Sequence, residues 1–410
     1  MASLIPVTTT RIGDHLPLLD LLNSDAPLSW VRNGEGLVGW GVHATTTVSG
    51  KDRFEKARTW WHHQLETFAV DNSVHGSGTG PVLFTSFSFD RNEESVLVIP
   101  KVIVGQKGSQ SWITLIGDTP QPVLPESPAQ HSQGTFTFCG GSISTSAWKE
   151  RVAEAIKRVG SSQVDKVVLA RDLVAESTTS IETAPILKKL AAEYPSTWTF
   201  AVDGLVGATP ELLLRLSRGM VTSRVLAGTI PKTGNDEKDL ALAASLARSS
   251  KDLEEHEYAV RSVADALSPF CTSTNVPETP FVLHLSNVMH LATDVTGVLS
   301  DSTNPADIFD LVSRLHPSAA VCGTPTELAK RTIDEIEGIS RGRYAGPIGW
   351  IDAKGDGELG IALRCGQISN DGQSIRIYAG CGIVAGSDPE REYAESQAKL
   401  LPMRSALEKH

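Results

Sequence analysis

Two pairs of carboxylates stand out, because each pair is spaced three residues apart on a strongly helical stretch. Asp252 and Glu255 lie in SSKDLEEHEYAV, and Glu392 and Glu395 lie in SDPEREYAESQAKL. Residues i and i+3 share one face of a helix, so each pair projects its carboxylates in one direction. Two such faces brought together would form an all-oxygen cage for a hard divalent ion, with Mg²⁺ the first choice, completed by an anionic substrate. Two solvated helix faces are the alternative.

Two other residues are candidates for acid–base chemistry. Lys166 lies in the β-branched stretch VDKVVLAR. There it is either an edge charge facing water or a desolvated amine with a lowered pKa, which could act as a general base. Glu211 follows GATP and precedes the apolar stretch LLLRLS. It is either a turn residue or a buried general acid whose pKa is raised.

Four residues could bind an anionic group. Gly228 and Thr229 follow the predicted strand MVTSRVLA, and a glycine there lets backbone N–H groups approach a carboxylate or phosphate. A strand-end turn explains them nearly as well. Arg364 in GIALRCG and Tyr344 in GRYAGPIGW are expected on neighbouring strands. The arginine could fork onto a carboxylate while the tyrosine hydroxyl adds a hydrogen bond, or it could be a surface residue.

A lysine and two histidines complete the candidates. Lys399 lies four residues beyond Glu395, on the same helix face, and could pair with it or reach an anionic ligand. His284 and His290 are six residues apart in one predicted strand, which places them on one face. With no third nitrogen or sulfur ligand nearby, a core or substrate-contacting role is favoured over a zinc site.

Composition narrows the class of protein. The chain has 410 residues, 40% hydrophobic and 21% charged, which is typical of a soluble globular protein. Its net charge of -11 disfavours nucleic acid and anionic membranes as partners. The five cysteines are odd in number and form no CxxC, so neither a disulfide framework nor a zinc site is indicated. Without a signal-peptide pattern or a long apolar run, a cytoplasmic location is expected.

The predicted elements favour an α+β fold, a single large domain of two mainly antiparallel sheets flanked by helices. Helices are predicted over 145–160, over most of 236–268 with a break near Ser249, around 305–314 and 327–337, and over 389–407. Strands are predicted at FTSFSFD, SVLVIPKVIVG, SWITLIG, KVVLARDL, WTFAVDGLVG, ELLLRLS, MVTSRVLAG and VLHLSNVMHLATDVTG, followed by a meander of RYAGPIGWID, GELGIALRCGQI and QSIRIYAGCGIV.

The chain is expected to form one domain over 1–410. Residues 1–135 carry a weaker pattern and are expected to complete the sheets, whereas 136–410 carry the motifs. A loop is predicted over 118–134, where Pro, Ser and Gln dominate. The sequence Gly380-Cys381-Gly382 does not indicate a dinucleotide-binding fold, because the later glycine spacing and a strict βαβ alternation are absent.

With these residues assembled, the chain resembles the chorismate-utilising enzymes, and within them most closely the isochorismate synthases. The resemblance runs from Phe136 to the C-terminus. It is carried, in order, by DKVVLAR, GATPELLLR, LAGTIPKTG, SSKDLEEHEYAV, LHPSAAVCGTP, GRYAGPIGW, ALRCG and YAGCGIVAGSDPEREYAESQAK. It implies two large, mainly antiparallel sheets flanked by helices, with the site in a cleft.

The resemblance also implies roles for the candidate residues. Lys166 matches the base that activates water for attack at C2 of chorismate, and Glu211 matches the acid that protonates the departing C4 hydroxyl. Metal ligands for Mg²⁺ are Glu255 and Glu395, with Asp252 and Glu392 in an outer shell or as alternates. Substrate-binding positions are Gly228, Thr229, His290, Tyr344, Arg364, Gly380, Gly382 and Lys399.

Within the family, Lys166 stands where the ammonia-using, anthranilate-forming branch has a glutamine. The resemblance therefore implies water as the nucleophile, and no glutaminase subunit is expected. Ala227 stands where the aminodeoxychorismate-forming branch typically has a nucleophilic lysine. The expected activity is therefore reversible conversion of chorismate to isochorismate, feeding menaquinone or siderophore synthesis, in a chain expected to be monomeric. Salicylate synthase, which adds pyruvate elimination, is the alternative, and a non-enzymatic metal-binding protein with the same fold is a more distant one.

Overall fold

The computed structural model describes residues 3–13, 17–22, 26–122, 134–161, 164–300 and 306–408. Most of the loop predicted over 118–134 and the first residues of the helix predicted from Pro305 lie outside these ranges. Within them, no helix is both long and apolar enough to cross a membrane.

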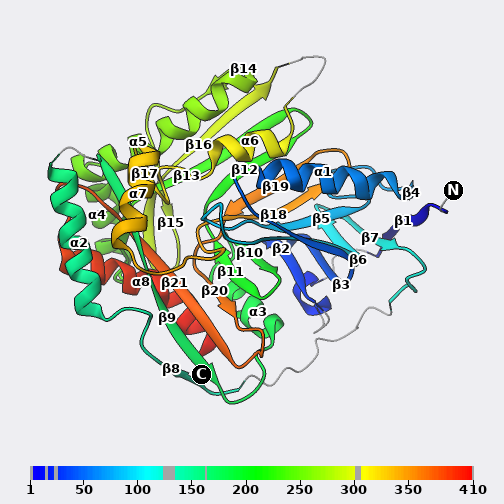
Figure 1. The fold of residues 1–410 in the computed structure, drawn as a ribbon, viewed down its shortest axis with the longest axis horizontal. Coiled ribbons are helices and arrows are strands. Elements are labelled where there is room, and N and C mark those ends of the chain that lie inside the picture. The colour runs from blue at the N-terminus through cyan, green and yellow to red at the C-terminus, as the bar shows by residue number, and fades with distance from the viewer. Residues whose placement is uncertain are drawn as a thin grey trace.

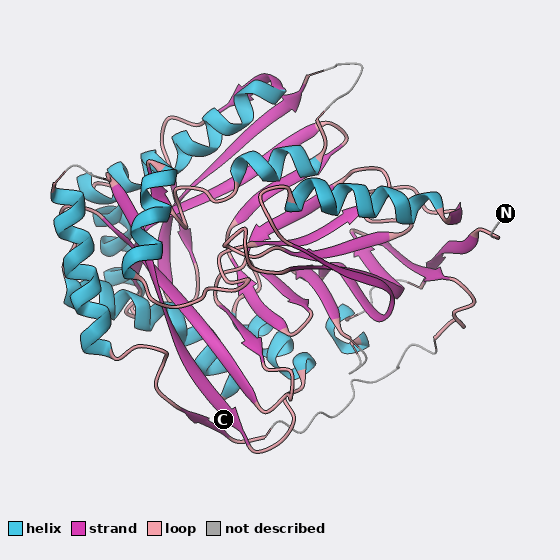
Figure 2. Cartoon of the chain, viewed as in Figure 1, coloured by secondary structure: helices cyan, strands magenta, loops and turns pink. Residues whose placement is uncertain are grey.

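The strand network starts from two long antiparallel strands, β3 (Glu35–Val48) and β6 (Ser95–Lys107), which pair along most of their length. Two series of antiparallel strands diverge from this pair. We call the series that continues from β3 the first arm and the series that continues from β6 the second arm. The two arms separate toward the left-hand side of Figure 1, so the predicted mainly antiparallel α+β architecture is confirmed (Figures 1 and 2).

In the first arm the pairing order after β3 is β2 (Leu28–Arg32), β10 (Trp198–Val202), β11 (Leu205–Thr209), β20 (Cys365–Ile368), β21 (Ser374–Ile383) and β9 (Lys166–Ser177). In the second arm the order after β6 is β5 (Val82–Ser86), β18 (Pro347–Asp352), β19 (Gly357–Ile361), β12 (Leu212–Ser217), β13 (Met220–Pro231) and β16 (Val288–Leu299). Strands from the N-terminal part thus pair directly with motif-bearing strands, in β2–β10 and β5–β18.

The remaining strands extend this network. They are β1 (Ile5–Ile12), β4 (Phe68–Asn72), β7 (Gln110–Ile116), β8 (Phe136–Phe138), β14 (Cys271–Asn275), β15 (Phe281–His284) and β17 (Gly323–Thr324). The pairing of β1 with β4 is parallel. The main hydrophobic core contains residues from both arms, among them Trp30, Phe200, Leu214 and Ile348.

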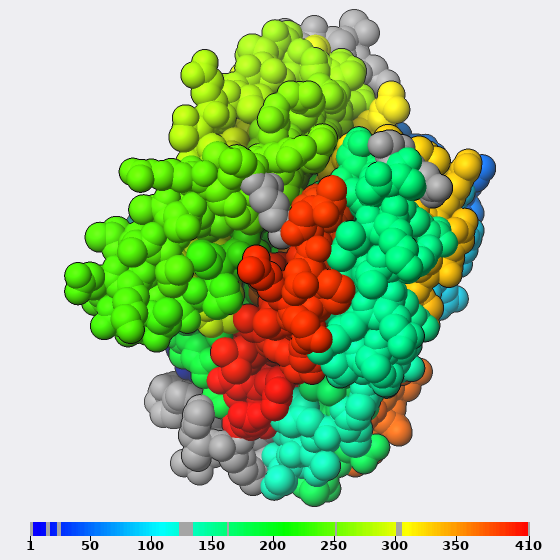
Figure 3. Space-filling model, turned by 90° about the vertical axis from the view of Figure 1, so that its left-hand side faces the viewer, coloured from blue at the N-terminus to red at the C-terminus, as the bar shows by residue number. Residues whose placement is uncertain are grey.

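Helices cover the strand network. They are α1 (Arg53–Glu66), α2 (Thr145–Gly160), α3 (Thr183–Glu193), α4 (Asp236–Leu246), α5 (Ser250–Leu267), α6 (Ile308–Leu315), α7 (Thr326–Ile336) and α8 (Pro389–Leu407), with short 3₁₀ turns at Leu18–Leu21 and Ser268–Phe270. A second core cluster joins α3 and the end of α8 to the first arm. On the face shown in Figure 3, α8 (red) lies between α2 (teal) and the green segment that contains α4.

Helix ends follow from local sequence. The predicted limits of α2 and α8 are confirmed, with Ser144 capping α2 and Asp388 capping α8 before a proline at the first helical position. The predicted break near Ser249 is confirmed as well. The hydroxyl of Ser249 accepts the backbone N–H of Asp252, so the serine ends one helix segment and starts α5.

Two of the predicted strands were wrong in extent. WTFAVDGLVG forms two strands, because Asp203 and Gly204 both adopt positive φ and turn the chain into a hairpin. VLHLSNVMHLATDVTG also forms two strands. His290 lies opposite Leu283 and His284 opposite Met289, so the two histidines point to opposite faces. The prediction that both histidines lie on one face assumed an unbroken strand. The turn between them contains no glycine or proline that would indicate it.

The predicted three-strand meander was also wrong in its middle strand. GELGIALRCGQI splits into β19 in the second arm and β20 in the first arm, and residues 362–364 cross between them. Arg364 has φ +49, a left-handed conformation that breaks the strand. Neither Arg364 nor Tyr344 lies on a strand, so their predicted placement on neighbouring strands is corrected to two loops.

Candidate active site

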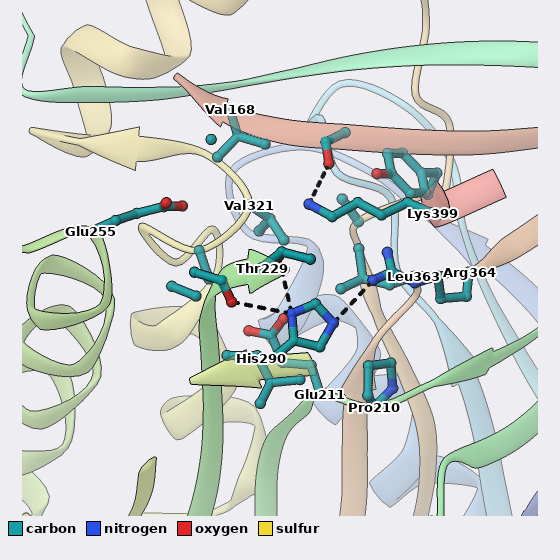
Figure 4. Close-up of a pocket in the computed structure, with 18 of the residues that line it drawn as sticks. Val168, Pro210, Glu211, Thr229, Glu255, His290, Val321, Leu363, Arg364 and Lys399 are labelled. Atoms are coloured by element: carbon teal, nitrogen blue, oxygen red, sulfur yellow. Dashed lines mark hydrogen bonds between the residues drawn. The ribbon is translucent and has the colours of Figure 1, made fainter. Parts of the chain in front are cut away.

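A cavity opens where the far ends of the two arms face each other. It encloses about 600 Å³, counting its open mouth, and its lining includes β9 and β21 from the first arm and β13 and β16 from the second. Two chain crossings close its floor. The segment Pro210–Glu211 leads from β11 to β12, and residues 362–364 return from β19 to β20. Figure 4 shows Glu255 on one side of this cavity, with His290, Arg364 and Lys399 on the other.

Lys166 is held in the protein interior by an acidic partner. Its side chain is 1% exposed, and its Nζ lies 3.1 Å from Oε1 of Glu255, which lines the cavity. The edge-charge alternative is therefore wrong, because the side chain is buried, with β17 paired at Lys166 and β21 paired from Val167 onward. A buried amine needs a hydrogen-bond partner in place of its lost hydration, and the carboxylate of Glu255 supplies one.

Glu211 is a buried carboxyl at the start of β12, 5% exposed. Burial raises its pKa to about 8, and the positive charges of Lys166, Arg364 and Lys399 oppose that rise. At neutral pH the group is thus mostly protonated and can donate a proton. Glu211 lies in the connection before β12, as the turn alternative had it, and it is also buried, as the general-acid alternative requires.

His290 organises the wall opposite Glu255. Its Nε2 lies 3.2 Å from Nη2 of Arg364, and its Nδ1 lies 3.1 Å from Oγ1 of Thr229 and 3.4 Å from the carbonyl oxygen of Gly228. An arginine can only donate, so Nε2 must be the acceptor and Nδ1 carries the proton. Burial, reinforced by Arg364 and Lys399, lowers the pKa of His290 well below its ordinary value, which keeps the ring neutral.

Two cations face the cavity from this side. Arg364 is 7% exposed, and burial lowers its pKa. Lys399 on α8 pairs with Oε1 of Glu395 at 2.5 Å and donates to the carbonyl oxygen of Gly380 at 3.0 Å. Burial acts to lower the pKa of Lys399, but the charge of Glu395, the influence of Cys381 and the hydrogen bond to Glu395 together outweigh it and raise that pKa.

Tyr344 lies beside these cations in the loop before β18. Its ring stacks on Tyr378 with centroids 5.0 Å apart, and burial raises the pKa of its hydroxyl. The hydroxyl is close to β21, because a Cβ added to Gly380 would meet it at 3.0 Å. The phenol therefore stays protonated and available as a hydrogen-bond donor.

Two glycines are required by close packing around the carboxylates. A Cβ on Gly382 would lie 2.4 Å from Oε1 of Glu255 and 2.9 Å from Cε of Lys166. Gly228 has φ +76 at an irregularity of β13, and a Cβ there would lie 3.1 Å from Cβ of Asp252. The first turn of α5 thus packs closely on the backbone of Gly228.

The four proposed metal ligands are only partly brought together. Among the described residues, ligand atoms of Cys381, Glu392 and Glu395 lie within 4.8 Å of one another, and this group does not include Glu255 or Asp252. Asp252 instead accepts a hydrogen bond from Ser249 at the start of α5. Glu255 and Glu395 are each paired with a lysine.

Sequence reasoning missed several lining residues. They are Val168, Pro210, Leu226, Ala320, Val321, Arg341 and Leu363. Ala320 and Val321 lie inside the motif LHPSAAVCGTP, which signalled the segment but not its role as a wall. Arg341 carried no signal, because an arginine before a glycine-rich loop is usually solvated.

The fold and the residues around the cavity are those of a known class of protein. The chain matches the chorismate binding enzymes over residues 29–408, and it belongs to that family. It is similar to isochorismate synthase MenF of Bacillus subtilis, with 33% identity over 90% of this chain and 85% of that protein. It is also similar to the vibriobactin-specific isochorismate synthase of Vibrio cholerae, with 33% identity over 97% and 95% of the two chains.

A solved structure agrees with the fold. The chain superimposes with a TM-score of 0.80 on the structure assigned as the 2,3-dihydroxybenzoate-specific isochorismate synthase DhbC of Bacillus anthracis, with 30% identity over 95% of this chain and 98% of that one. The expected family membership is therefore confirmed.

Proposed function

We propose that this chain is an isochorismate synthase that converts chorismate reversibly to isochorismate, with Mg²⁺ as cofactor. The observation that carries the proposal is the placement of an amine and a carboxyl around one cavity. Glu211 lines the cavity, whereas Lys166 does not line it and lies behind Glu255, which does. Lys166 is a buried amine beside Glu255, and Glu211 is a buried carboxyl with a pKa of about 8. The relatives named above support the same activity.

The carboxylates of this region suit a hard divalent ion. Glu255 presents a carboxylate to the cavity, and Glu392 and Glu395 lie together on α8 beside the thiol of Cys381. Glu255 and Glu395 would bind Mg²⁺, with Glu392 and Asp252 in supporting positions. When bound, the ion would neutralise a substrate carboxylate and help to orient the ring.

The remaining groups fit a dianionic substrate. Arg364 and Lys399 present two positive charges at the wall opposite Glu255, and Tyr344 adds a hydroxyl donor. We assign them to the enolpyruvyl carboxylate of chorismate, with the backbone of Gly380 and Gly382 beside it. Neutral His290 holds the guanidinium of Arg364 in place.

The chemical steps then divide between two residues. Lys166 accepts a proton from water as it adds to C2 of the ring. Glu211 donates its proton to the hydroxyl that leaves C4, and the ring double bonds shift between the two positions. An acid and a base at separate places are needed, because proton removal and proton donation occur at different carbons.

Product analysis tests this assignment. Purified protein with chorismate and Mg²⁺ should yield isochorismate by liquid chromatography, and the reverse reaction should yield chorismate. Excess EDTA should abolish turnover, and Mg²⁺ should restore it. Formation of pyruvate and salicylate as the main products would assign the chain to the salicylate synthases, and conversion unaffected by EDTA would contradict the cofactor.

A further inference from the structure

Arg341 lines the cavity together with Arg364 and Lys399, yet its contacts are of a different kind. It is 3% exposed and forms a buried ion pair with Glu337, also 3% exposed, just after α7. Its Nε donates to Oε1 of Glu337 at 2.6 Å and its Nη2 to Oε2 at 2.5 Å. The same guanidinium donates to the backbone oxygens of Val321 at 2.8 Å and Val168 at 2.7 Å.

The ion pair completes an edge of strand β9. Strand β17 pairs with β9 at Lys166 and Val167, and β8 pairs with it only from Ala175 onward. Between these positions, Arg341 satisfies the oxygen of Val168, and Glu337 accepts the N–H of Ala170 at 2.7 Å. Buried backbone groups need partners, so two side chains replace a neighbouring strand two to four residues beyond Lys166.

The guanidinium has little capacity left for a ligand. An arginine has five N–H donors, and four hydrogen bonds to Glu337, Val321 and Val168 are already formed. Its face lies 4.1 Å from the ring centre of Phe89. Position in the cavity wall alone would suggest a third substrate-binding cation, but these contacts join β9 to the Val321 wall.

We propose that Arg341, oriented by Glu337, is a positioning residue that fixes the strand carrying Lys166 relative to the Val321 wall of the cavity. The inference rests on the proposed function for its kinetic readout. Without the hydrogen bonds of the Arg341 guanidinium, the amine of Lys166 and the bound substrate can shift relative to each other. A displacement of about 1 Å is enough to reduce turnover up to 100-fold. Substrate affinity is retained, because Arg364 and Lys399 are untouched.

The test is Arg341→Lys, which keeps the charge but loses the planar fork. The matched control is Arg343→Lys, because Arg343 is a half-buried arginine that also pairs with a carboxylate, Asp203, and donates to backbone oxygens, but it does not line the cavity. Both are assayed where circular dichroism shows them folded. We expect kcat at least ~10-fold lower in Arg341→Lys, KM for chorismate within ~3-fold of wild type, and near-normal kinetics in the control.

A second variant and a second readout keep the proposal testable. Glu337→Gln preserves volume and an acceptor for Ala170, and it should give the same kcat effect if Arg341→Lys fails to fold. Hydrogen–deuterium exchange of the peptide spanning residues 166–171 should be faster in either variant, and this readout needs no turnover. It therefore stands even if wild-type protein fails to convert chorismate, which would refute only the proposed function.

Three kinetic results would overturn the inference. A raised KM with unchanged kcat in Arg341→Lys would make Arg341 a substrate contact. An equal fall of kcat in Arg343→Lys would show general loosening of the fold rather than positioning. Unchanged kcat in a folded Glu337→Gln variant would also contradict the role given to the ion pair.

Discussion

Lys166 and Glu255 are direct partners, with Nζ and Oε1 3.1 Å apart and the lysine side chain 1% exposed. The two residues come from different parts of the fold, strand β9 in the first arm and helix α5, which packs on β13 and β16 of the second arm. In the proposed function, the lysine activates water and the glutamate binds a cation. A cation at Glu255 must therefore compete with the lysine for the same carboxylate.

Replacing Lys166 should separate these two roles. We expect Lys166→Ala to lose at least ~100-fold in kcat, the lower end for removal of a general base. Mg²⁺ should bind at least as tightly as in wild type, because Glu255 loses a competing charge. Steady-state kinetics and calorimetric titration of Mg²⁺ measure the two effects. Lys188→Ala is the control, since Lys188 also pairs with a carboxylate, that of Asp20, which does not line the cavity as Glu255 does. Near-normal turnover in Lys166→Ala would remove its assignment as base.

The raised pKa of Glu211 predicts a pH dependence of catalysis. The acid must be protonated before substrate adds, so kcat/KM should fall as pH rises through about 8. Glu211→Gln should lose at least ~100-fold in kcat, with residual activity that lacks this alkaline limb. Rate profiles from pH 6 to 10 test both statements. A wild-type profile that stays flat above pH 8, or a glutamine variant with full activity, would exclude Glu211 as the acid.

The same carboxyl predicts a pH dependence of stability. Its pKa is 4.5 in a model peptide and about 8 in the fold, so the folded state binds an extra proton between these values. Stability from this group is present below pH 4.5 and is lost at up to roughly 1.4 kcal/mol per pH unit as pH rises toward 8. Glu211→Gln avoids this loss. Its melting temperature should exceed that of wild type by a margin that grows from pH 5 to 8, and a constant margin would contradict the shift.

Arg364 should govern substrate affinity. We expect Arg364→Lys to raise KM for chorismate at least ~10-fold with a smaller effect on kcat, because a lysine cannot fork onto a carboxylate or donate to His290 from the same position. Arg224→Lys is the control, since Arg224 forks onto Asp294 with two 2.7 Å hydrogen bonds away from the cavity. A kcat loss without any change in KM would place Arg364 in the chemical step instead.

Gly382 should tolerate no side chain. A Cβ there would lie 2.4 Å from the carboxylate of Glu255, so Gly382→Ala should displace the glutamate and lower both kcat and the apparent affinity for Mg²⁺ by ~10-fold or more. Gly386→Ala is the matched control in the following loop, because its Cβ would meet nothing within 4 Å. Equal behaviour of the two variants in Mg²⁺ titrations would show that the close approach has no functional consequence.

The sequence predicted those parts that depend on short-range chemistry. The limits of α2 and α8 and the break at Ser249 follow from caps within a few residues. Strands interrupted by tight turns were predicted less well. The turn at Asp203 and Gly204 has a local signal that the prediction did not use, since Asp-Gly favours the positive φ that both residues adopt. The turn between β15 and β16 contains no glycine or proline, and it is defined by the pairing of these two strands.

By its own residues, the sequence determined the family, the helical carboxylate pairs and the presence of one candidate base and one candidate acid, because motif order and i, i+3 spacing are local properties. Only the tertiary structure decided which alternatives hold. In the folded chain Lys166 is buried against Glu255, and the pKa of Glu211 is raised. Arg341 donates its hydrogen bonds to backbone oxygens rather than to a ligand. Burial and charge pairing depend on chain segments far apart in sequence, and here the two diverging arms bring those segments to one cavity.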